Sequence, residues 1–201
     1  MMGPINLDLP TLIGSRICHD LISPIGAINN GLELLNMAGT GAAPGPELEL
    51  IGQSVESASA RIRFFRIAFG ASGDQTMGQG EVTSILRDLY TDTRIEIEWQ
   101  ITVPQSRDCV RMAFLSLMCM ETALHHGGLI TIAEQAGKWR LQAEADKIAV
   151  EPELWALLSK ADQDMQLQPA QVQFALLPIL ARAQGKEISL TNTETVLTVS
   201  F

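Results

Sequence analysis

The sequence predicts an α+β protein, in which an N-terminal helical hairpin forms a dimeric four-helix bundle and a C-terminal α/β sandwich follows. Three observations support this prediction. Apolar residues recur at helical spacing in two long segments before residue 70, helical and alternating segments intermingle after residue 80, and a glycine-rich stretch separates the two regions. We therefore place a hairpin domain for dimerisation over residues 1–70 and the sandwich over residues 81–201.

The first predicted helix runs from about residue 8 to about residue 37. At about 100° per residue, its apolar positions fall within roughly 80° of arc, which is typical of an amphipathic helix. These positions are Ile17, Leu21, Ile25, Ile28, Leu32 and Leu35. Pro24 lies inside the helix, where its ring removes one backbone hydrogen bond and favours a bend. The glycine- and proline-rich residues 39–46 predict a loop.

The second predicted helix covers residues 47–69, and its apolar residues alternate spacings of three and four in a heptad seam. The seam consists of Leu48, Ile51, Val55, Ala58, Ile62, Phe65 and Phe69. Two helices joined by a short loop form an antiparallel hairpin. Because a lone hairpin buries its apolar stripe poorly, we expect two copies to pair in a four-helix bundle, which predicts a homodimer.

Residues 70–80 form the glycine-rich linker. Beyond them, segments with helical periodicity are mixed with segments in which apolar and polar residues alternate. Helices are expected at 81–90, 107–126, 151–160 and 169–184. Strands are expected at 95–103, 129–134, 138–143, 187–191 and 195–201. This order predicts an α/β sandwich with a mostly antiparallel sheet.

Composition excludes several classes of function. The net charge of −9 argues against nucleic acid as the main partner, because phosphate contacts need a basic surface. The three cysteines have no framework spacing, so we expect reduced thiols in a cytoplasmic protein. The start of the chain lacks a basic region before an apolar run, and the apolar runs are too short to span a bilayer. We therefore expect neither a signal peptide nor a membrane partner.

His19 is the candidate catalytic residue of the first helix. It lies roughly 160° from the centre of the apolar stripe, so we expect it to face water. The same side of the helix carries Arg16, Ser23, Gly26 and Asn30. The small side chains among them, at Ser23, Gly26 and Asn30, would admit a partner's helix. An exposed imidazole on a rigid helix suits a nucleophile that a partner protein must reach. A lone helical histidine is more often an ordinary surface residue. Its position around the helix therefore leaves both interpretations open, a nucleophile and an ordinary surface histidine.

The segment from His19 to Ile25, HDLISPI, resembles the phosphoacceptor box of sensor histidine kinases. In that box an acid, an apolar residue and, soon after, a proline follow the histidine. Ile22 departs from the box, because many kinases carry a basic residue there. The longer residues 18–35 and the later residues 63–70, RFFRIAFG, resemble the ChpT-like histidine phosphotransferases of alphaproteobacteria, and this resemblance extends over nearly the whole chain.

The resemblance implies a histidine phosphotransferase in a bacterial phosphorelay. His19 would accept a phosphoryl group from the receiver domain of a hybrid histidine kinase and pass it to response regulators, which in this family include a cell-cycle transcription regulator. Asp20 is the candidate to orient the N–H of the ring. Mg²⁺ is expected on the partner receiver domain, with no metal or cofactor held by this chain. Receiver docking is expected at Arg16, Ser23, Gly26, Asn30 and Arg61, whose basic members would steer acidic surfaces.

The C-terminal elements follow the order seen in the ATP-binding domain of histidine kinases, but the nucleotide-binding residues of that family do not match. The long helix at residues 114–124 contains no asparagine to hold Mg²⁺, and Glu121 is its only acid. No Asp-x-Gly sequence occurs in the chain, and residues 143–149 contain no glycine that would let backbone amides approach a phosphate. We therefore predict a degenerate domain that does not bind ATP, so that another protein must supply the phosphoryl group.

Two other interpretations stay open. The chain could be a divergent, ATP-dependent histidine kinase, although the missing adenine-binding aspartate and glycine loops count against this. It could also be a non-catalytic dimerisation scaffold in which His19 is incidental. The small side chains around His19 count against the scaffold.

Overall fold

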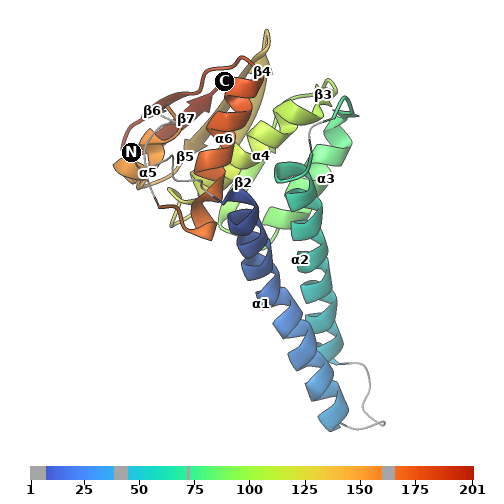
Figure 1. Ribbon diagram of the computed structural model, residues 1–201. Coiled ribbons are helices and arrows are strands. Elements are labelled where there is room, and N and C mark those ends of the chain that lie inside the picture. Colours follow the sequence, from blue (N-terminus) through green and yellow to red (C-terminus); the bar gives the residue numbers. More distant parts are fainter. Residues whose placement is uncertain (1–7, 39–44, 72, 160–165) are drawn as a thin grey trace.

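A long helical hairpin projects from a mixed α/β body in the computed structural model, which describes residues 8–38, 45–71, 73–159 and 166–201 (Figure 1). The hairpin consists of α1 (Leu9–Ala38) and α2 (Pro46–Ala68). The predicted α+β class is confirmed, and both hairpin helices end within a residue or two of their predicted bounds. Most of the loop predicted over residues 39–46 lies outside the described residues.

Local chemistry accounts for where α2 begins and ends. Pro46 occupies the first turn, where its missing N–H costs no hydrogen bond, and Glu47 and Glu49 complement the positive end of the helix dipole. At the other end, two arginines of the α/β body satisfy orphan carbonyl groups. Arg107 Nη2 donates to the carbonyl of Arg66 at 2.7 Å. Arg111 Nε donates to the carbonyl of Ala68 at 3.1 Å.

The α/β body contains a five-stranded sheet in the order β2-β4-β5-β7-β6. Its strands are β2 (Ile95–Trp99), β4 (Gly128–Gln135), β5 (Lys138–Glu144), β6 (Ser189–Asn192) and β7 (Val196–Ser200). The β2–β4 pair is parallel and the other pairs are antiparallel, as expected for a mostly antiparallel sheet. Buried residues alternate along β5, so one face of the sheet points to the core.

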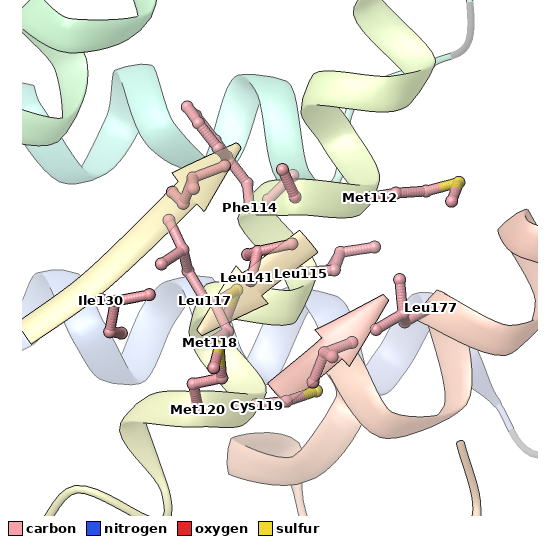
Figure 2. Close-up of a cluster of buried hydrophobic side chains, with 14 of the residues drawn as sticks. Met112, Phe114, Leu115, Leu117, Met118, Cys119, Met120, Ile130, Leu141 and Leu177 are labelled. Carbon is pink, nitrogen blue, oxygen red and sulfur yellow. The ribbon is translucent and has the colours of Figure 1, made fainter. Parts of the chain in front are cut away.

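Helix α4 (Arg107–Glu121) forms the centre of the core, and every residue from Val110 to Met120 is buried. Its side chains leave the helix in several directions and meet the sheet at Ile130 and Leu141 and helix α6 (Val172–Ala183) at Leu177 (Figure 2). A helix covered on all sides has no polar face, which explains its continuous apolar sequence. The remaining helices are α3 (Gln79–Tyr90), the short α5 (Pro152–Ala156) and the 3₁₀ turn η1 (Pro169–Gln171).

Several predicted bounds were wrong. The strand expected over 95–103 ends at Trp99, and Gln105–Ser106 form a separate short strand, β3, that pairs with β1 (Thr76–Met77) inside the predicted linker. The helix expected over 107–126 ends at Glu121, because the chain turns toward Gly127, whose φ of 91° suits glycine. The helix expected over 151–160 is shorter than predicted: of the described residues 151–159, only Pro152–Ala156 form an α-helix.

Hairpin and body share one hydrophobic core. The last turns of α2 contribute Phe64, Phe65, Ile67 and Ala68 to the same cluster as α4 and the sheet. The first half of α1 packs on that cluster through partly buried side chains, including Ile17. No helix in the described ranges combines the length and the apolar character needed to cross a membrane.

Candidate active site

His19 projects from α1 into solvent, with 84 % of its side chain exposed. Its neighbours Ile17 and Leu21 are half-buried on the opposite side of the helix. The prediction that His19 faces water is confirmed, because the helical period turns it away from the apolar stripe. A partner protein can therefore reach the outer edge of the imidazole ring.

Asp20 lies beside His19 but is largely covered, with 11 % of its side chain exposed. Its Oδ1 lies 3.1 Å from His19 Nδ1, and its Oδ2 lies 2.8 Å from Arg16 Nε. A carboxylate paired with a guanidinium only accepts hydrogen bonds, so Nδ1 is the nitrogen that carries the proton of a neutral ring. The Nε2 lone pair of His19 is then directed outward, available as a nucleophile.

Arg16 holds Asp20 from one turn earlier in α1, and 17 % of its side chain is exposed. Its Nη1 also donates to the backbone carbonyl of Ala170 at 2.9 Å. The guanidinium therefore joins α1 to η1 of the α/β body. Arg16, which we expected to dock receivers, offers a partner only a small part of its side chain.

The other expected docking residues divide into two groups. Ser23 and Asn30 are exposed on α1, and Gly26 between them faces open space, since an added Cβ would meet no atom within 4 Å. Arg61 on α2 is instead partly buried, and its Nε has no hydrogen-bond partner among the residues that the structure describes. The α1 residues thus form an open strip below His19, whereas the Arg61 side chain is partly covered.

Tyr90 and Glu121 form a covered hydrogen bond where α3 and α4 end, with the Tyr90 hydroxyl donating to the Glu121 carboxylate. Burial raises the pKa of Glu121, and the Tyr90 hydrogen bond and the charges of Arg16 and Arg61 oppose that rise. The Asp20 charge adds to it. The α/β body thus places an acid within electrostatic reach of the Arg16–Asp20 pair. Sequence reasoning noted Glu121 only as the single acid of an apolar helix and missed this contact.

The described residues contain no group of three or more His, Cys, Asp or Glu side chains arranged to hold a metal ion. His125 and His126 are exposed in the turn that follows α4. The group that this geometry exposes for chemistry is the His19 imidazole, which lies beside Asp20.

Comparison with known proteins shows the family of this chain. Residues 79–196, more than half of the chain, match the family model of the histidine phosphotransferase C-terminal domain. The protein phosphotransferase ChpT of Brucella abortus (strain 2308) is 32 % identical over 196 residues, which cover 93 % of this chain and 91 % of that protein. A bacterial phosphotransferase of known structure at 1.7 Å aligns with a TM-score of 0.80 at 31 % identity, over 99 % of this chain and 98 % of that one.

Proposed function

Because the chain belongs to the histidine phosphotransferase family, we propose that His19 carries the phosphoryl group in its phosphorelay. Phosphotransferase activity follows from the family; the assignment of His19 rests on one observation. An imidazole that is 84 % exposed keeps Nδ1 next to a covered carboxylate, so that Nε2 faces a partner. Asp20 is the proposed orienting residue.

The transfer step follows from this arrangement. The Nε2 lone pair of His19 attacks the phosphorus of an aspartyl phosphate on a receiver domain, and the bond from phosphorus to the aspartate oxygen breaks. The receiver's carboxylate leaves with the electron pair, and the phosphoryl group remains on Nε2. The proton stays on Nδ1, and the positive charge of the phosphorylated ring faces the Asp20 carboxylate. The Mg²⁺ that neutralises the phosphoryl oxygens would belong to the receiver.

The proposed phosphoryl donor is the receiver domain of a hybrid histidine kinase, and the acceptors are response regulators. The same step run in reverse passes the group from His19 to the aspartate of the second receiver. The strip formed by Ser23, Gly26 and Asn30 supports docking next to His19, because small side chains let a receiver helix approach α1 closely.

We further propose a homodimer through the hairpin. Several stripe and seam positions stay between 45 % and 54 % exposed in one copy: Ile25, Leu32, Leu48, Val55 and Ile62. Exposed apolar residues repeated along two paired helices favour burial against a second hairpin. A four-helix bundle formed by two copies would cover them.

Phosphoryl transfer is tested with labelled receivers. We expect the purified protein to take label from a phosphorylated receiver domain, and His19→Ala to take none. His125→Ala is the matched control, because it removes another exposed histidine and should leave transfer unchanged. Label taken from ATP alone would support the interpretation as a divergent, ATP-dependent histidine kinase. If the protein takes no label from any of several receivers, the interpretation as a non-catalytic dimerisation scaffold is supported.

A further inference from the structure

Arg16 connects two parts of the molecule that are far apart in the sequence. Its Nε donates to Asp20 Oδ2 at 2.8 Å, and its Nη1 donates to the carbonyl of Ala170, 154 residues along the chain, at 2.9 Å. A guanidinium is planar and presents its N–H groups in a fixed fork. One side chain thus fixes the Asp20 carboxylate relative to the α/β body.

The Ala170 carbonyl is itself held in place. The buried side chain of Gln173 donates to it at 2.9 Å and reaches the carbonyl of Met118 in α4 at 3.4 Å. Gln168 and Gln171 close a capping box around the same turn. Arg16 is therefore anchored to a backbone position that the core of the body defines.

We propose that Arg16 is a positioning residue, through which the α/β body sets the tautomer of His19. The inference rests on the proposed role of His19 as phosphoacceptor. With Oδ2 held by Arg16, Oδ1 of Asp20 stays directed at Nδ1 of His19, 3.1 Å away. This keeps the proton on Nδ1 and the lone pair on Nε2, where an incoming phosphoryl group meets the ring.

Without Arg16, the Asp20 carboxylate would lose its cationic partner and rotate toward water. The ring would then exchange between both neutral tautomers, one of which places a hydrogen on the attacking nitrogen. Lysine does not replace arginine here, because its single ammonium does not reproduce the fork that spans Asp20 and Ala170. Arg16→Lys therefore preserves the charge and most of the length of the side chain while removing the proposed function.

The test reads the tautomer directly, independently of activity. In the ¹⁵N-labelled full chain at about pH 8.5, where imidazoles are neutral, the ring nitrogen shifts of His19 report which nitrogen carries the proton. The chain has only three histidines, so loss of signals in His19→Ala assigns the ring. We expect a single Nδ1–H form in the wild type and a mixture in both Arg16→Ala and Arg16→Lys.

Phosphoryl transfer should fall about tenfold in both variants, as for other residues that orient a reacting group. Arg87→Ala, which removes an exposed arginine of α3 that also pairs with an aspartate, should change neither readout. An unchanged tautomer in Arg16→Lys would overturn the proposal, whatever the transfer rate. If Arg16→Ala fails to fold, Arg16→Lys alone decides. A wrong choice of phosphoacceptor is recognised separately, by label retained on His19→Ala.

Discussion

Phe64 of α2 stacks on Phe114 of α4 with ring centroids 4.5 Å apart and ring planes within 3° of parallel. Both rings are almost fully buried, so the hairpin ends inside the core of the α/β body. The arginine caps on the last carbonyls of α2 reinforce the same junction. The base of the hairpin and the body therefore fold as one unit, which lets residues of the body influence His19.

Truncating this aromatic contact should weaken the whole protein. We expect Phe64→Ala to lower the free energy of unfolding by about 3 to 5 kcal/mol, because it removes a buried ring and leaves a cavity. Chemical denaturation measures the change. Ile179→Ala, at an exposed apolar position of α6, should cost much less. Equal losses in the two variants would contradict a shared core at the junction.

The role of Asp20 is tested by replacing its charge while keeping its size. Asp20→Asn weakens the ion pair with Arg16 and reduces stabilisation of the positive ring that forms on transfer. We expect the rate of transfer from a phosphorylated receiver to fall about 10- to 100-fold, with the fold retained by circular dichroism. A wild-type rate would show that Asp20 takes no part in transfer.

Oligomeric state tests the apolar face of the hairpin. We expect light scattering to give twice the chain mass of 21.8 kDa for the wild type. Val55→Glu should give the mass of a single chain, because dimerisation would bury its charge in the proposed bundle. Gln53→Glu adds the same charge at an exposed position on roughly the opposite side of α2 and should remain dimeric. If the wild-type protein has the mass of a single chain, the proposed homodimer is wrong.

The covered acid predicts a dependence of stability on pH. Burial raises the pKa of Glu121 above its ordinary value of 4.5, so the folded protein holds this proton more tightly than the unfolded chain. The stability that the protonated Glu121 side chain contributes is therefore fully present below pH 4.5. It is lost as the pH rises through the pKa of Glu121 in the folded protein. The glutamine of the Glu121→Gln variant does not titrate. The stability of this variant relative to wild type should therefore increase as the pH rises from about 4.5 to 7.

Denaturation at several pH values across this range measures the difference. Glu153→Gln, at an exposed position in α5, should keep a constant difference from wild type. A constant difference for Glu121→Gln would mean that the Tyr90 hydrogen bond and the arginine charges fully offset burial.

Much of the fold was readable from the sequence because it depends on local periodicity. The bounds of α1 and α2 follow from apolar spacing and flanking Gly and Pro residues, and the exposure of His19 follows from its angle to the apolar stripe. The β1–β3 pair could not be predicted, because strands of two residues carry no detectable alternation. The early end of α4 depends on a turn that leads directly into β4.

The candidate site divides in the same way. The sequence by itself determined that His19 faces water and that Asp20 is its neighbour on the same helix, because one element and its period set both positions. Only the tertiary structure decided that Arg16 reaches Ala170 and that Glu121 lies within electrostatic reach of Asp20. These contacts join segments more than 100 residues apart, and packing rather than local pattern brings such segments together.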